Sequence, residues 1–245
     1  MWSLLNPVVF LAVFTFVSKV LGGNLTDYPV FLLSGLLAWN LFSVALTSGA
    51  QSVIANANLV KKVYFPREVL PLATLGAALV DFVLQSCVFF AFIVVFGYGF
   101  RLGTLWLYPL AFAALLLFTT AMLLWVSALN VRYRDVQHLL GLALLVWFWL
   151  TPIVYAAGPV HTHILATSHG ALFWVAYLLN PASWIVFGFQ GALYHSTYLG
   201  TSPLAPFSTG QLALGLLGVI AVSSLLLFLT WRAFFSMSGD FAEEL

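Results

Sequence analysis

The segment richest in chemically informative residues is 58–67, which reads Asn58, Leu59, Val60, Lys61, Lys62, Val63, Tyr64, Phe65, Pro66 and Arg67. At 3.6 residues per turn, its apolar side chains share one helical face and its lysines lie elsewhere, which predicts a short amphipathic helix. Pro66 ends that helix because proline has no backbone donor. Such a helix either lies on lipid headgroups, with its lysines on anionic lipid, or docks on a partner protein.

A second polar junction follows a long apolar run and consists of Arg132, Tyr133, Arg134 and Asp135. Asn130 is expected to close the preceding helix, and Asp135 lies near the start of the next, where the helix dipole favours a negative charge. Arginines at such a place either hold the boundary of a membrane or help to contact a partner protein. Both interpretations stay open at this point.

Aromatic side chains make up 17% of the chain and gather in the apolar runs. Most are explained by packing and by the aromatic belts found where a membrane meets water. A ring face also offers a sugar an apolar platform without requiring a set pattern of hydrogen bonds. The rings considered for such a path are Phe10, Phe14, Trp39, Phe42, Trp147 and Trp149.

Signals for catalysis or metal binding are weak. Asp81 lies inside an apolar run, where a carboxylate must be paired or hydrated, and it serves either a structural contact or transport. Histidines occur at 161, 163 and 169 without a cysteine or acidic companion, so no metal site is expected. The sequence contains neither Gly-x-x-x-x-Gly-Lys-Ser/Thr nor Gly-x-Ser-x-Gly, so we expect no ATP site of that type and no enzyme activity.

These residues must be positioned in a membrane. The chain is 63% hydrophobic and 6% charged, whereas soluble domains carry about 25% charged residues. A membrane span needs roughly 20 apolar residues. We therefore predict an all-α integral membrane protein, one domain over residues 1–245, with six transmembrane helices at about 4–21, 30–53, 69–96, 105–129, 138–156 and 211–235.

A further apolar stretch, 171–194, is interrupted by Asn180 and Pro181. Proline and the residue before it disfavour helix, so the stretch divides into pieces of about nine and thirteen residues. Neither piece can span a bilayer alone, which favours an extracellular re-entrant helical hairpin between the fifth and sixth spans. The alternative is one kinked seventh span.

Charge placement supports six crossings. With the amino terminus inside, six basic residues face the cytoplasm and only Lys19 and Arg101 face outward, whereas a seventh crossing leaves five against three. Both termini are then cytoplasmic. The net charge of +1 gives no reason to expect a nucleic-acid partner.

Four strings carry a family resemblance. They are WSLLNPVVFLAVFTFV, NANLVKKVYFPREVLPLATLGAALVDF, LNVRYRDVQHLLGLALLVWFWLTPIVY and LLNPASWIVFGFQGALYH. In this order they resemble the first span, the first loop with the third span, the junction of spans four and five, and the re-entrant segment of ABC-2 type permeases. These permeases export O-antigen, capsule and teichoic-acid chains, and the resemblance covers nearly the whole chain.

The resemblance implies a permease subunit of an ATP-driven exporter of lipid-linked polysaccharide in the bacterial inner membrane. It implies two copies of this subunit with two copies of a separate ATP-binding subunit, which would hold the ATP and Mg²⁺, so no cofactor is expected in this chain. It assigns residues 58–67 to coupling with the ATPase and a sugar path to spans one, two and five. The alternatives are teichoic acid, a drug or a small lipid as substrate, and a membrane-embedded transferase as a different class.

Overall fold

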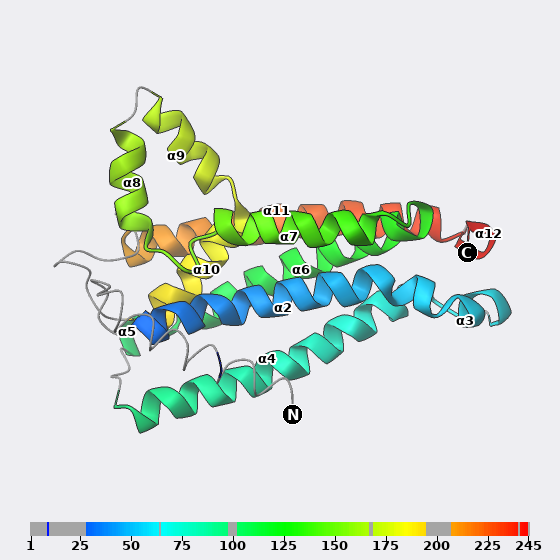
Figure 1. Ribbon diagram of the computed structural model, residues 1–245, viewed down its shortest axis with the longest axis horizontal. Coiled ribbons are helices and arrows are strands. Elements are labelled where there is room, and N and C mark those ends of the chain that lie inside the picture. The colour runs from blue at the N-terminus through cyan, green and yellow to red at the C-terminus, as the bar shows by residue number, and fades with distance from the viewer. Residues whose placement is uncertain are drawn as a thin grey trace.

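The computed structural model describes residue 9 and residues 28–63, 65–97, 102–166, 169–194, 207–239 and 241–244. This part of the chain is helical, without a strand. Its long helices run side by side along the longest axis of the molecule (Figure 1). They are α2 (Tyr28–Ala55), α4 (Val69–Val95), α6 (Leu107–Arg132), α7 (Val136–Leu150) and α11 (Thr209–Ser238).

Four described helices are long and apolar enough to cross a membrane, and a bent pair of shorter helices would make a fifth. The four are α2, α4, α6 with its preceding turn, and α11. They match the predicted spans 30–53, 69–96, 105–129 and 211–235 to within three residues at each end. The predicted span 4–21 lies outside the described residues except for Val9.

The predicted span 138–156 takes a different form. Its helix, α7, has 15 residues and ends at Leu150, and Thr151 is already extended. Pro152 explains this early end, because a residue that precedes proline is disfavoured in helical geometry. At 1.5 Å per residue, α7 is about 22 Å long, which is less than the roughly 30 Å of bilayer hydrocarbon.

The stretch 171–194 is broken where the sequence predicts. It forms α9 (Gly170–Leu178) and α10 (Pro181–Leu193), which meet at an angle of 77°. The helix that runs beside α9 is α8 (Ala157–Leu165), and this pair projects from the bundle, whereas α10 lies within it (Figure 1). The sequence did not predict α8, which falls between the predicted span 138–156 and the stretch 171–194.

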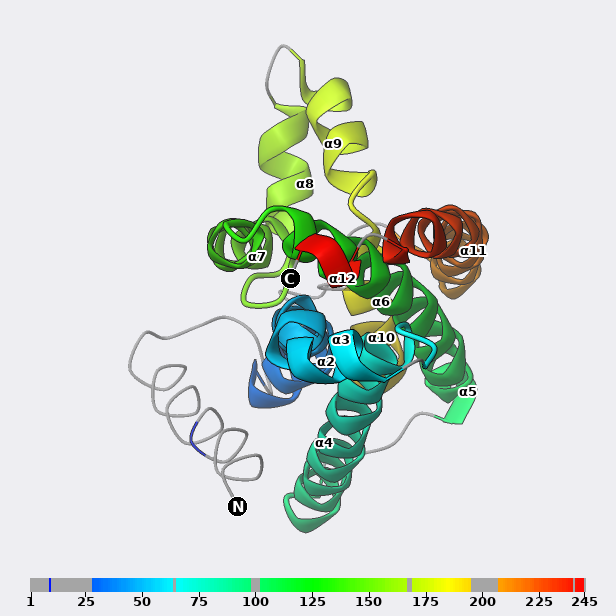
Figure 2. The ribbon, with the colours of Figure 1, turned by 90° about the vertical axis from the view of Figure 1, so that its right-hand side faces the viewer.

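The core lies where α2, α6 and α10 meet, and α11 covers another side of α6 (Figure 2). Nearly every residue of α10 is buried. Gly188 allows this close packing, because a Cβ atom there would lie 2.7 Å from the Ala111 side chain of α6. Small residues at such crossings let membrane helices approach closely.

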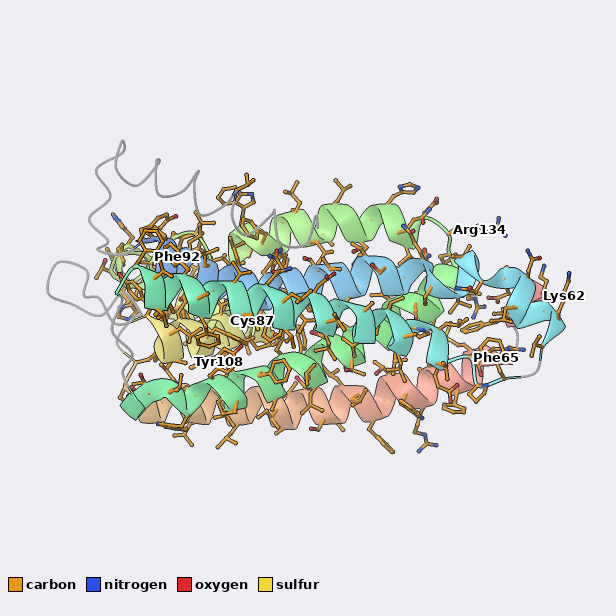
Figure 3. All side chains as sticks on the ribbon, turned by 90° about the horizontal axis from the view of Figure 1, so that it is seen from below. Lys62, Phe65, Cys87, Phe92, Tyr108 and Arg134 are labelled. Carbon is orange, nitrogen blue, oxygen red and sulfur yellow. The ribbon has the colours of Figure 1, made fainter. Side chains whose placement is uncertain are left out.

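One end of the bundle carries the described lysines and arginines, and we call it the charged end. It holds the short helices α3 (Ala57–Lys62) and α12 (Phe241–Glu244), together with the junction of α6 and α7. Figure 3 shows Lys62, Phe65 and Arg134 at this end, far from Phe92 at the other. The opposite end holds α5 (Leu102–Leu105) and the start of α2 (Figure 1).

Candidate functional site

The amphipathic helix predicted in the first loop is α3, and it ends before Pro66 as expected. Its apolar residues do not share one environment. Val60 is 4% exposed and packs into the bundle, whereas Leu59 and Val63 are 43% and 51% exposed. Tyr64 lies outside the described residues. The charged end therefore presents two exposed apolar side chains next to the exposed Lys61 and Lys62.

A cavity of about 690 Å³ lies between this loop and the end of α11. Its lining combines basic, acidic and apolar residues from 60–63 and 65–68 with Phe235, Ser238 and Gly239. The Arg67 guanidinium donates a hydrogen bond of 3.4 Å to the Gly239 carbonyl oxygen. The loop is thus connected to the end of the last long helix.

All four residues of the second junction, 132–135, are exposed, and the junction lies at the same end (Figure 3). The Arg132 guanidinium lies 5.9 Å from the centre of the Tyr133 ring. Asp135 occupies the N-cap position of α7 as predicted, although its side chain caps no backbone group there. The expectation for Asn130 is wrong. It does not close α6, which runs on to Arg132, and its buried side chain bonds to two other helices.

Sequence reasoning missed a polar face on α2. It consists of Asn40, Ser43, Thr47, Ser48 and Gln51, which are half-buried or exposed in the middle and second half of an otherwise apolar helix. The spacing of these residues places them within one side of a helical wheel, which also carries the exposed Val44. That spacing could have revealed the polar face from the sequence. Ser43 and Thr47 donate their hydroxyls to carbonyl oxygens of the same helix, as hydroxyl groups in apolar surroundings do.

The polar face continues onto α4. Asn40 donates a hydrogen bond of 3.1 Å to the Gln85 side chain. Asp81 lies one turn from Gln85 on the same side of α4, is half-buried, and forms no hydrogen bond or ion pair within the described part of the chain. Because α2 and α4 run antiparallel, Asp81 lies level with Ser43. Its carboxylate therefore belongs beside the polar face.

The first half of α2 is covered by neighbouring helices. Residues 29–39 are all buried against neighbouring helices. Gly35 packs tightly, since a Cβ atom there would lie 3.3 Å from both Gln190 and Val186 of α10. Gln190 also donates a hydrogen bond of 2.9 Å to the Pro152 carbonyl oxygen after α7. The polar face thus opens toward the charged end and stops near Asn40.

The aromatic residues considered for a sugar path occupy different environments. Trp39 and Phe42 are buried, and the rings of Phe42 and Trp147 meet at a centroid distance of 5.3 Å. Trp147 is half-buried, whereas Trp149 is 59% exposed. The remaining two, Phe10 and Phe14, lie outside the described residues.

Asn180 and Pro181 form a tightly bonded corner. The Asn180 side chain accepts hydrogen bonds from the Trp147 indole at 2.8 Å and from the Ala182 amide at 3.1 Å. Its amide donates to the Thr151 hydroxyl at 3.2 Å. Pro181 opens α10, a position where its missing N–H costs nothing. This corner joins the outer end of α7 to the start of the buried helix α10.

Metal binding has no support in the described part of the chain, where no three metal-ligating side chains gather. His161 instead packs its ring 4.6 Å from that of Trp174. Cys87 is exposed on α4 (Figure 3).

Long apolar helices, one charged end and a polar face at membrane depth define a multi-pass membrane protein. Residues 1–194 match the family model described as "ABC-2 type transporter". The chain therefore belongs to the ABC-2 type transporter family, which indicates a membrane subunit of a transporter.

Three relatives are called O-antigen export system permease protein RfbA. Two, from Klebsiella pneumoniae, are each 34% identical over 161 residues, which cover 65% of this chain and 62% of theirs. The third, from Myxococcus xanthus, is 27% identical over 249 residues, which cover 100% of this chain and 87% of its own. The chain thus aligns with less than two thirds of the length of the Klebsiella proteins.

Proposed function

We propose that this chain is the membrane-spanning permease subunit of an ATP-driven exporter of lipid-linked polysaccharide of the O-antigen type. The names of its three relatives support the substrate class. Family membership supports pairing with a separate ATP-binding subunit. That subunit holds the ATP and Mg²⁺, and two copies of it act with two copies of this chain.

The polar face of α2 is the single observation that carries this proposal. A carrier of apolar molecules has no need of hydroxyl and amide groups at membrane depth, whereas a hydrated glycan does. The Thr47 hydroxyl donates to the Ser43 carbonyl oxygen at 2.8 Å, so its own lone pairs stay free to accept hydrogen bonds from sugar hydroxyls. We infer that the polar face forms part of the wall of the export path.

The placement of the basic residues supports an orientation with the charged end in the cytoplasm. The described lysines and arginines are Lys61, Lys62, Arg67, Arg132, Arg134 and Arg232. They lie at the charged end, which the positive-inside rule places in the cytoplasm together with the carboxyl terminus. The amino terminus is also cytoplasmic with six spans, the first at 4–21. With this orientation the path opens toward the cytoplasm, and α9 and α10 form the re-entrant segment on the outer side.

The ATP-binding subunit docks on α3 and the second junction. Both lie at the charged end, where Leu59 of α3 and Val63 directly after it offer apolar contacts with lysines around them. An apolar centre with a charged rim is the usual composition of a protein interface. Val60, buried beneath, would carry movement of α3 into the bundle.

The test is export in cells that make the lipid-linked glycan but lack their own exporter. The chain expressed with its ATP-binding subunit should place polymer on the cell surface, and a partner unable to hydrolyse ATP should not. Thr47→Leu with Gln51→Leu should reduce surface polymer while leaving assembly intact. Val83→Leu, at an exposed apolar position on the far side of α4 from Asp81, is the matched control. Full export by the double variant would contradict a role of the polar face in the export path. Surface polymer without ATP hydrolysis would contradict the proposal that ATP hydrolysis drives export.

A further inference from the structure

The side chain of Asn130 joins three helices at the charged end. It is fully buried, with 0% exposure. Its amide donates a hydrogen bond of 2.7 Å to the Ala50 carbonyl oxygen in α2. Its side-chain oxygen accepts a hydrogen bond of 3.0 Å from the backbone N–H of Gln137 in the first turn of α7. One side chain of α6 thus holds the end of α2 and the start of α7 together.

The two hydrogen bonds of Asn130 lie near the start of α7 and near the end of α2. The first amides of a helix have no partner inside it, so Asn130 supplies the cap for α7 that the Asp135 side chain does not. Ala50 lies a turn and a half before the end of α2 at Ala55, and α3 begins at Ala57. Asn130 therefore contacts the base of the segment that carries α3.

Asn130 is followed in the chain by Val131, which belongs to an apolar cluster. Buried side chains from five helices form one cluster at the charged end, and we call it the inner cluster: Val53, Val60, Leu124, Ala128, Val131, Phe234 and Phe241. Val60 brings α3 into this cluster, and Phe241 brings α12. Hydrogen bonds are stronger where water is excluded, so those of Asn130 define the relative position of α2, α6 and α7.

The helix that Asn130 holds is weakly packed elsewhere. Leu144, at 7% exposure, is the one buried side chain of α7, and residues 136–143 contribute none. At its outer end α7 is held by the bond from the Trp147 indole to Asn180, next to the ring contacts of Trp147 and Phe148. A helix held at its two ends by polar contacts can shift without breaking a large apolar core.

We propose that Asn130 is the positioning residue that transmits movement of α3 to α7, and through Asn180 to the outer segment. This rests on the proposed function, because α3 moves only if the ATP-binding subunit docks there. Movement of α3 shifts the end of α2 through the inner cluster, Asn130 shifts the start of α7, and α7 displaces the corner at Asn180. The docking surface at α3 and the outer segment are then connected through α7.

The experiment compares variants of the whole transporter in lipid nanodiscs. In a Cys87→Ser background, spin labels at Leu150→Cys on α7 and Val95→Cys on α4 report the outer ends of both helices, since both positions are exposed. ATP should change the distance between the labels. Asn130→Leu should lower the ratio of the two conformers with ATP by about tenfold, or about 1.4 kcal/mol, with assembly and basal ATP hydrolysis retained.

Two further variants separate transmission from folding. Ser127→Ala is the matched control, because Ser127 is as deeply buried on the same helix but bonds only within it, to Leu124. It should behave as the background protein does. Asn130→Asp keeps an acceptor for the Gln137 amide and loses the donor to Ala50, so it should give an intermediate response.

Each outcome is decisive. An unchanged ATP response in Asn130→Leu overturns the role of Asn130. Failure of both Asn130 variants to assemble, with normal assembly of Ser127→Ala, also overturns it, because the residue would then serve the fold alone. If the background protein exports polymer but α7 does not move with ATP, the transmission route is wrong and the proposed function stands. If the background protein with its partner exports nothing, the proposed function itself fails.

Discussion

Docking of the ATP-binding subunit at α3 predicts a measurable loss of affinity when two exposed apolar residues are replaced, Leu59 of α3 and Val63 directly after it. Leu59 and Val63 are 43% and 51% exposed, so about half of each side chain is still available for burial by a partner. Complete burial of such a side chain contributes about 1.5–3 kcal/mol. Half of that range is about 1 kcal/mol for each residue.

The double variant Leu59→Ser, Val63→Ser should therefore weaken docking by about 2 kcal/mol, which raises Kd roughly 30-fold. The assay measures binding of the purified ATP-binding subunit to this chain in nanodiscs by biolayer interferometry. Serine is a poorer helix former than leucine by only about 0.5 kcal/mol, so unfolding of α3 does not account for an effect of that size.

Val60→Ala is the matched control within the same helix. Val60 is 4% exposed and contacts the bundle, so its truncation should lower the stability of the chain by roughly 2 kcal/mol and leave Kd nearly unchanged. Two results would refute docking through Leu59 and Val63. One is an unchanged Kd in the double variant, and the other is a larger loss of affinity in Val60→Ala than in the double variant.

Three other changes follow from the packing. Gly188→Ala should lower the melting temperature, because its Cβ atom would lie 2.7 Å from the Ala111 side chain; overpacking costs about 1–3 kcal/mol, and an unchanged melting temperature would contradict the close helix contact. Phe241→Ala removes a side chain with 0% exposure and should destabilise the charged end by about 3–5 kcal/mol, seen as faster hydrogen exchange in α3 and α12. Trp147→Phe deletes the indole donor to Asn180 and should raise amide exchange at the start of α10 about fivefold, for a loss of about 1 kcal/mol.

The sequence was sufficient for the positions of the long helices and for the corner at Asn180. Apolar runs of span length leave few alternatives in a bilayer, and Asn-Pro breaks a helix through its own backbone chemistry. The early end of α7 follows from the same rule applied to Pro152, which the length of the apolar run concealed. Local covalent chemistry decides such features, so they can be predicted from sequence.

Features that depend on neighbouring helices could not be predicted in this way. Leu59 and Val60 are adjacent and equally apolar, and only the placement of the inner cluster decides which of them is buried. Asn130 reads as a helix terminator because its partners, Ala50 and Gln137, come from other elements. The polar face of α2 was visible as spacing, but its meaning depends on which side of the helix stays uncovered.

The most direct test of the central claim asks whether the polar face of α2 meets water from the charged end. In a Cys87→Ser background, single cysteines are placed at Thr47 and Gln51, and at Val83 and Leu217 as exposed apolar controls on α4 and α11. A membrane-impermeant thiol reagent is applied to inside-out vesicles. Rapid labelling at Thr47 and Gln51, with protection at both controls, is the predicted result; protection of all four positions would contradict the account.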